Sequence, residues 1–212
     1  MFVRPIIASL ALSLAASTVA AQAAPAAAPA PAGLTEWTID NSHTSVGFTV
    51  PHMVVSEVDG HFKQYKGQAL LDEKNLQNSQ VSFSIDAASV DTGDVKRDEH
   101  LRSPEFFDAA KFPQLTFKST KITKAGSSYK LQGDLTIHGI TKNVTLTANV
   151  SDSVANPWGK LVRAVKITGK IKRADFGLNW NKALDKGGFV VGDTVDLNLK
   201  LELNRAAGET KT

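Results

Sequence analysis

The feature that most constrains the fold is a regular alternation of apolar and polar residues along much of the chain. In "VDLNLKLEL", Val195 and the leucines at every second position after it are separated by Asp196, Asn198, Lys200 and Glu202. Successive side chains of a β-strand point to opposite faces, so this segment predicts a strand with one apolar and one wet face. The same alternation recurs in "VGFTV", "VSFSI", "VTLTANV" and "VKITGKIK". We count about eight to ten such strands.

Strands with only one apolar face are typical of antiparallel sheets, and this many of them predict an all-β barrel or sandwich. One stretch, residues 94–112, breaks the alternation. Ser103 followed by Pro104 and Glu105 reads as the start of a helix, and Pro113 prevents its continuation. We therefore expect one or two short helical turns here, lying across one end of a barrel.

The apolar faces are expected to point inward. The opposite faces carry Lys, Asp, Asn and Glu in the middle of strands, which suits water. A barrel facing lipid would need a girdle of aromatic residues at its strand ends, and the aromatic residues are not placed in that way. The alternation cannot separate an interior filled by side chains from a channel lined by them, because both are apolar.

The two ends of the chain differ in composition from the middle. Residues 1–23 combine Arg4, an apolar run and small residues, as in a secretory signal peptide cleaved after Ala21 or, as we favour, Ala23. We therefore expect export to the periplasm. Residues 24–34 predict an Ala/Pro-rich tether, residues 35–204 one folded domain, and residues 205–212 a polar tail.

Composition and motifs argue against several classes of function. The chain has no cysteine, so disulfides are excluded, and its 24 basic and 21 acidic residues are scattered rather than gathered as in a nucleic-acid binder. The five histidines lie at least nine positions apart, so we expect no metal centre. Neither a "GxSxG" motif nor a glycine-rich phosphate loop occurs. We expect a protein that is not an enzyme and has no cofactor.

Four stretches in order along the chain resemble the YceI-like family. They are "HTSVGFTVPHM", "RDEHLRSPEFFDAAKFPQLTFKS", "GDLTIHGITKNVTL" and "RADFGL", and the resemblance covers about Trp37 to Leu203. It implies an extended antiparallel β-barrel of about eight strands, lipocalin-like, that encloses a long isoprenoid lipid, either a polyprenyl pyrophosphate or the tail of a quinone.

Under this resemblance the inward residues of the strands would line a ligand channel. The expected lining is Phe48, Val50, Phe83, Ile85, Phe117, Leu135, Ile137, Leu146, Ile167, Phe176, Leu197 and Leu199. A polar head group would need cations or hydrogen-bond donors at the mouth of the channel. The candidates for that role are His43, Arg97, His100 and Arg173.

Two other readings stay open. A barrel filled by its own side chains would suit a stress-protection or interaction module, and an enzyme acting on a lipid or quinone would need several titratable groups around one cavity. A homodimer and transient contact with a membrane or with lipid enzymes also stay open as expectations.

Overall fold

The structure of the protein is a computed structural model that describes residues 33–185 and 187–206. The predicted signal peptide, and the tether up to residue 32, lie outside the described residues. In the part of the chain that the structure describes, no helix has the length and apolar character needed to cross a membrane.

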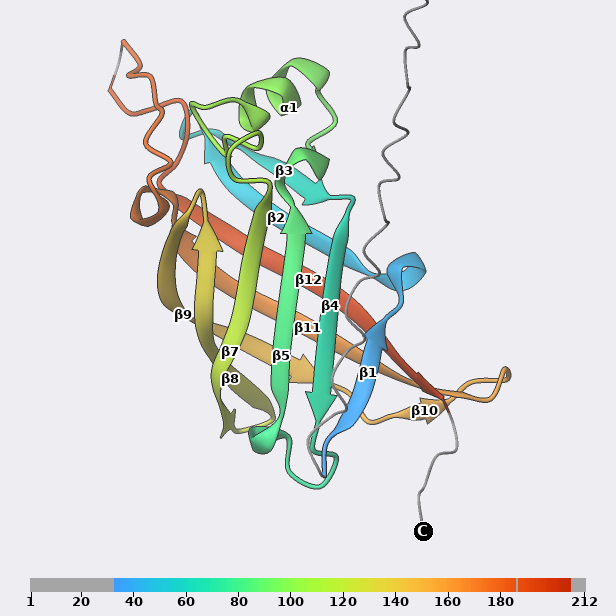
Figure 1. The fold of residues 1–212 in the computed structure, drawn as a ribbon. Helices are drawn as coiled ribbons and strands as arrows, with labels where there is room; N and C mark the ends of the chain where they lie inside the picture. The colour runs from blue at the N-terminus through green and yellow to red at the C-terminus, as the bar shows by residue number, and fades with distance from the viewer. Residues whose placement is uncertain (1–32, 186, 207–212) are drawn as a thin grey trace, which may run out of the picture.

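The described residues form one antiparallel sheet that closes into a barrel (Figure 1). The strands are β1 Thr35–Ile39, β2 Ser45–His52, β3 Ser56–Phe62, β4 Tyr65–Leu71, β5 Gln80–Asp86, β6 Val90–Asp91, β7 Gln114–Ala125, β8 Ser128–Ile137, β9 Ile140–Val150, β10 Val154–Ala155, β11 Lys160–Lys172 and β12 Thr194–Ala206. Eight of them, in the order β11-β9-β8-β7-β5-β4-β1-β12, form the closed barrel, because β12 pairs back with β11. The predicted fold class is confirmed.

The register of β11 and β12 explains why the alternation predicts correctly which side chains face the interior of the barrel. Ile167 is opposite Leu199, and Lys166 is opposite Lys200, so apolar residues of the two strands share one face and lysines the other. The apolar pair points into the barrel, where Ile167 is buried. Alternation with period two therefore places the same residue types on the inner face of both strands.

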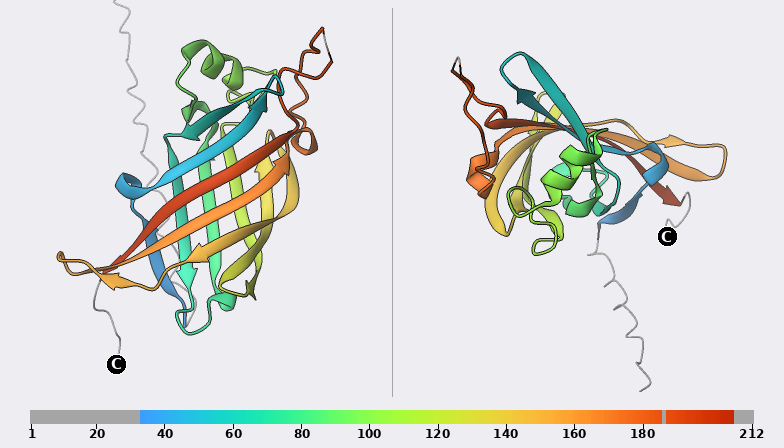
Figure 2. Two further views of the ribbon diagram at one scale, coloured as in Figure 1. Left: turned by 180° about the vertical axis from the view of Figure 1, so that it is seen from behind. Right: turned by 90° about the horizontal axis from the view of Figure 1, so that it is seen from above.

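Strand β12 divides its second edge between two partners. Residues 203–204 pair with β1, whereas residues 196–200 pair with β2. The hairpin of β2 and β3, extended by β6, consequently leaves the closed barrel and stands over one end of it (Figure 1). Helix α1, Val95–Arg102, lies across the same end (Figure 2).

The helix itself differs from the sequence prediction at its start. Asp94 is the N-cap and its side chain accepts a hydrogen bond from the backbone N–H of Arg97. Ser103 is the C-cap, with an extended backbone (φ −70°, ψ 168°). The prediction that Ser103 and Pro104 begin a helix was wrong: residues 104–107 form turns, and the extended backbone of Ser103, which a following proline favours, closes α1. Pro104 therefore ends this helix rather than starting one.

Within the described residues, four short 3₁₀ turns connect the strands: η1 Asn41–His43, η2 Leu76–Asn78, η3 Ala87–Ser89 and η4 Arg173–Phe176. The end of the barrel away from α1 is filled by Trp37, which is fully buried against Ala69, Leu71 and Leu203. The guanidinium groups of Arg163 and Arg205 lie over the Trp37 ring, at 5.3 and 5.4 Å from it. Strand β12 extends to Ala206, into the predicted polar tail, and the rest of that tail lies outside the described residues.

Candidate functional site

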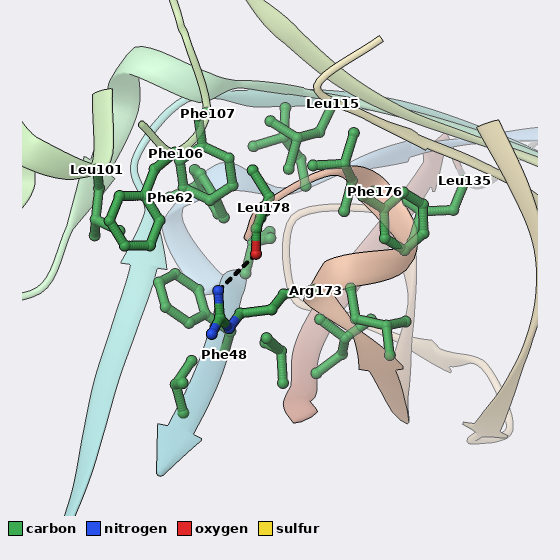
Figure 3. Close-up of a pocket in the computed structure, with 18 of the residues that line it drawn as sticks. Phe48, Phe62, Leu101, Phe106, Phe107, Leu115, Leu135, Arg173, Phe176 and Leu178 are labelled. Carbon is green, nitrogen blue, oxygen red and sulfur yellow. Dashed lines mark hydrogen bonds between the residues drawn. The ribbon is translucent and has the colours of Figure 1, made fainter. Parts of the chain in front are cut away.

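The upper part of the barrel encloses an apolar cavity of about 470 Å³ that reaches to the end covered by α1 (Figure 3). A smaller cavity of about 70 Å³ lies deeper. Both share Val81, Phe83, Leu131, Ile167 and Leu201, so the two are neighbours along the barrel axis. The interior is thus not completely filled by its own side chains.

All of the residues predicted to line a channel lie in the wall of the larger cavity. They are Phe48, Val50, Phe83, Ile85, Phe117, Leu135, Ile137, Leu146, Ile167, Phe176, Leu197 and Leu199. They come from β2, β5, β7, β8, β9, β11, β12 and η4. The wall therefore collects inward residues from most of the sheet.

Glycines on the inner face leave room for the largest of these side chains. A Cβ atom at Gly60 would collide with the ring of Phe48, and one at Gly133 would collide with the ring of Phe117. Glycine at these two positions lets a neighbouring aromatic ring lie flat over the strand. The phenyl rings consequently cover the wall instead of extending across the cavity.

The upper rim of the cavity contains an aromatic cluster that the alternation does not indicate. Phe62 lies 5.7 Å from Phe48 and 5.8 Å from Phe107, measured between ring centroids. Phe106 and Leu101, from the segment around α1, also line the cavity (Figure 3). The two phenylalanines of "PEFF" indicate burial. This segment lacks the alternation of a strand, so the sequence does not predict which way its side chains point.

The basic side chains that line this cavity gather at its α1 end. Lys96, Arg97 and His100 of α1 line the cavity, and so does His52 at the end of β2. Arg97 donates hydrogen bonds to Thr92, at 2.7 Å to the side-chain oxygen and 2.9 Å to the carbonyl. Among the described residues that line the cavity none is an aspartate or glutamate. The polar end of the cavity is consequently suited to an anion.

His100 is held by an aromatic environment and one carboxylate. Its ring lies 4.9 Å from that of Phe106 and 4.8 Å from that of Trp180, both edge to face. Its Nε2 atom is 2.6 Å from Glu105 Oε2, which fixes the orientation of the ring. His100 therefore lines the cavity at its α1 end, while one of its nitrogens is already engaged.

Arg173 lies in the cavity wall, but its guanidinium is occupied by the protein. It is 4% exposed and donates hydrogen bonds to the carbonyl oxygens of Leu178 at 2.6 Å, Trp180 at 2.8 Å and Gly192 at 2.9 Å. Asp193 lies 3.4 Å away. Burial lowers the pKa of Arg173, and the charge of Asp193 opposes that shift. These contacts tie both ends of the segment 177–193 to η4, so Arg173 organises the mouth rather than offering a free cation.

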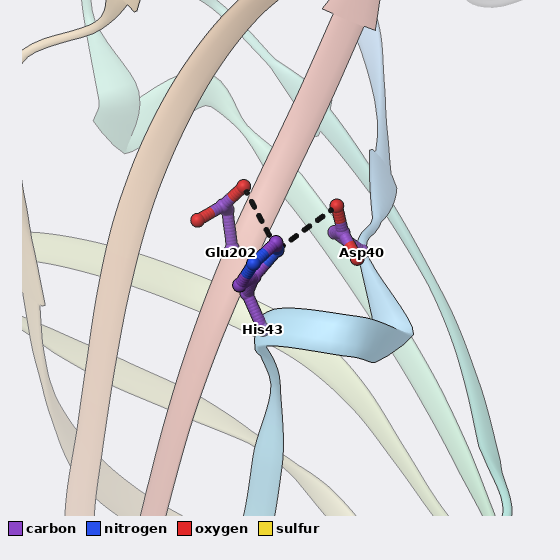
Figure 4. A group of neighbouring side chains, drawn as sticks. All are labelled: Asp40, His43 and Glu202. Carbon is purple, nitrogen blue, oxygen red and sulfur yellow. Dashed lines mark ion pairs between the residues drawn. The ribbon is translucent and has the colours of Figure 1, made fainter.

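His43 does not lie at the mouth, and its assignment to a head-group site was wrong. The residue ends η1 on the outer side of the barrel, with its side chain 66% exposed (Figure 4). Its Nδ1 atom is 3.4 Å from Asp40 Oδ2 and 3.7 Å from Glu202 Oε1. These three side chains are close enough to share a cation.

The buried Asp98 attaches α1 to the loop that precedes it. Asp98 is buried, and its carboxylate accepts hydrogen bonds from the backbone N–H of Thr92 at 2.9 Å and from its hydroxyl at 2.6 Å. Because Arg97 also binds Thr92, the helix is attached to the loop before it through one threonine. This attachment positions Lys96 and Arg97 over the cavity.

Comparison with known families agrees with this geometry. The profile of the YceI-like domain matches residues 37–203. The chain belongs to the YceI-like family. Protein YceI of Salmonella newport is 41% identical over 145 residues, which is 68% of this chain and 76% of that protein.

Solved structures of YceI-like and related proteins have the same barrel. BcnA of Burkholderia cenocepacia superposes with a TM-score of 0.68 at 27% identity, over 77% of this chain and 98% of that one. The YceI protein of Campylobacter jejuni gives a TM-score of 0.61 at 32% identity, over 81% and 98% of the two chains. A polyisoprenoid-binding domain from Saccharophagus degradans gives 0.57 at 18% identity, over 79% and 97%, which shows the fold alone.

Proposed function

We propose that the protein is an exported carrier that encloses the chain of a long isoprenoid lipid in its barrel and holds the lipid head at the end covered by α1. Residues 1–23 would direct export to the periplasm and be removed, leaving the tether and barrel as the mature protein. The barrel would then work in an aqueous compartment next to membranes.

The observation that carries this proposal is the distribution of polarity in the cavity. Its wall is apolar from β9 and β11 up to α1, and its basic residues, Lys96, Arg97 and His100 among them, lie at one end. A ligand that matches has a long apolar body and a single polar head. Ligand pockets commonly combine an apolar wall with a few placed polar groups in this way.

The cost of exposing such a lipid to water explains why an enclosing protein is needed. Burying one CH₂ group is worth about 0.8 kcal/mol, so a five-carbon isoprene unit costs on the order of 4 kcal/mol to leave in water. Eight units would cost on the order of 30 kcal/mol by the same transfer scale. A lipid of this kind cannot cross an aqueous space unassisted at a useful rate.

The charge of the mouth favours an anionic head over a neutral one. Lys96 and Arg97 stand at the mouth without a carboxylate in the cavity lining, and a pyrophosphate would satisfy both. We therefore favour a polyprenyl pyrophosphate as the ligand and a quinone as the second choice. The Saccharophagus degradans domain is described as polyisoprenoid-binding, and it shares this barrel architecture.

Native mass spectrometry of the protein purified from its own periplasm tests the proposal. The expected spectrum shows a chain beginning near Ala24 with a bound lipid, which organic extraction releases for identification. Lipid-free protein should then bind a supplied prenyl pyrophosphate. Protein that carries no lipid and also fails to bind the supplied one would remove the carrier function.

A further inference from the structure

The hairpin that joins β2 and β3 ends in three consecutive exposed apolar residues. The exposed fractions are 41% for Met53, 77% for Val54 and 85% for Val55. A single exposed apolar residue is ordinary, but a run of them at a protruding tip indicates a surface that contacts something else.

The backbone of this turn is unfavourable for the residues that occupy it. Met53 and Val54 have φ values of +49° and +66°, and the Val55 N–H donates to the His52 carbonyl at 3.2 Å. A hairpin turn with two positive φ angles prefers Asn-Gly, and a β-branched residue in this region is a genuine outlier. The chain thus has apolar side chains at the tip, although the backbone of the turn would favour residues such as Asn and Gly.

The tip is continuous with the mouth of the cavity. The Met53 N–H donates to the Val190 carbonyl at 2.9 Å, and His52 pairs with Val191. His52, Val190 and Val191 all line the cavity. Phe189, which is 55% exposed, extends the apolar surface on the neighbouring segment. An apolar path therefore runs from the outside of the hairpin into the barrel.

Charges around the tip are mixed, so the apolar residues decide what it contacts. Lys96 lines the cavity mouth, and the Lys182 carbonyl accepts a hydrogen bond from the Val190 N–H, so both cations belong to this end of the protein. Glu57 and Asp185 are exposed acids on the hairpin and the neighbouring segment. A patch of one sign would favour a highly charged partner, and this surface has none. The cations can still contact lipid phosphates at the level of the head groups while the apolar tip lies deeper.

We propose that the apolar tip, Met53–Val55 with Phe189, inserts into the surface of a lipid bilayer and places the cavity mouth against it. The proposal rests on the carrier function above, because a lipid cargo must enter from a membrane without crossing water. The apolar tip consists of four residues, far fewer than the roughly 20–30 residues a side of a stable protein–protein interface. A fluid bilayer needs no complementary shape.

The absence of cysteine makes a direct test available, because a single introduced cysteine takes a label at one site only. The full exported chain carrying Val54→Cys or Val154→Cys is labelled with an environment-sensitive fluorophore. Val154 is an exposed valine of β10, at the other end of the barrel (Figure 1). With vesicles of phosphatidylethanolamine and phosphatidylglycerol, the label at residue 54 should gain intensity several-fold and shift to shorter wavelength. The label at residue 154 should not change, and equal responses at both sites would overturn the proposal.

A second measurement separates docking from lipid carriage. The triple variant Met53→Ser, Val54→Ser, Val55→Ser should sediment with the same vesicles at least tenfold less than wild type, whereas Val154→Ser should match wild type. None of the three tip residues lines the cavity, so the triple variant should still bind a prenyl pyrophosphate supplied in solution. Undiminished sedimentation of the triple variant would refute docking. If the carrier function alone were wrong, the wild-type protein would sediment with vesicles but would neither carry lipid nor bind a supplied one.

Discussion

Arg173 donates a hydrogen bond of 2.6 Å to the carbonyl oxygen of Leu178 within the wall of the cavity (Figure 3). The same guanidinium also binds the carbonyl oxygens of Trp180 and Gly192. One buried side chain therefore satisfies backbone groups at both ends of the segment that borders the mouth. Lysine could not replace it, because an ammonium group lacks the planar fork that reaches several carbonyls at once.

Replacing Arg173 by Met should destabilise the protein by about 3 kcal/mol, because buried carbonyl groups lose their donors. Arg173→Lys should recover only part of that loss. Urea unfolding followed by circular dichroism measures both variants. If Arg173→Met changed the free energy of unfolding by less than about 0.5 kcal/mol, as expected of a surface residue, the role given to Arg173 would be wrong.

Replacing Arg97 by Ala should weaken the binding of a prenyl pyrophosphate by roughly ten- to a hundredfold, since a hydrogen bond to a charged group contributes about 1.5–3 kcal/mol. Binding of a quinone with the same tail should change little. Titration calorimetry of the lipid-free protein compares the two ligands. Lys166→Ala, on the outer face of β11, is the matched control and should leave both affinities unchanged. Equal losses for both ligands would contradict a head-group role for Arg97.

Replacing Ile137 by Trp tests whether the cavity holds the ligand. The added bulk has space to enter, so the lipid-free protein should keep nearly its full melting temperature while isoprenoid binding is lost. Val90→Trp is the control, because Val90 is fully buried and does not line the cavity. Overpacking there should cost about 1–3 kcal/mol or more. If Ile137→Trp lost stability to the same extent and wild type bound no lipid, the interior would be an ordinary core.

Asp40 should contribute stability that disappears in acid. The backbone N–H of Ser42 lowers the pKa of Asp40 below its usual value, and His43 and Asn204 act in the same direction. Because the folded pKa lies below the unfolded value of about 3.9, this stabilisation is complete above about pH 4 and is lost as pH falls through the folded pKa.

The variant Asp40→Asn keeps an oxygen for Ser42 but removes the charge. It should be less stable than wild type at pH 7, and the difference should shrink below about pH 4. Thermal melts across that range measure the effect. A difference that stays constant down to the lowest pH would show that the charge of Asp40 is not involved.

The sequence predicts the wall of the cavity well and its mouth poorly. Alternation with period two decides which face of a strand a residue occupies, and Leu135, Ile137 and Leu197 follow it inside. It does not decide which end of a strand lies at the opening. His43 and His52 flank β2 at opposite ends, and only His52 reaches the cavity.

Two other features had no signal of their own in the sequence. Arg173 binds carbonyl groups of the backbone, and such partners leave no trace in a pattern of side chains. Phe62 and Phe107 reach the cavity from the β2–β3 hairpin and the segment after α1, so their contact depends on how β12 divides its edge between β1 and β2. That division is a property of the whole sheet.

Trp37, with Arg163 and Arg205 over its ring, obstructs the barrel at the end away from α1, so the proposed lipid would use the opening beside α1. A lipid carried in such a tube would enter tail first and leave head first through one opening. Two lipid molecules could not pass each other inside the barrel. One lipid would therefore have to leave before the next could enter. The carrier would then deliver single molecules, always with the same end presented to the receiver.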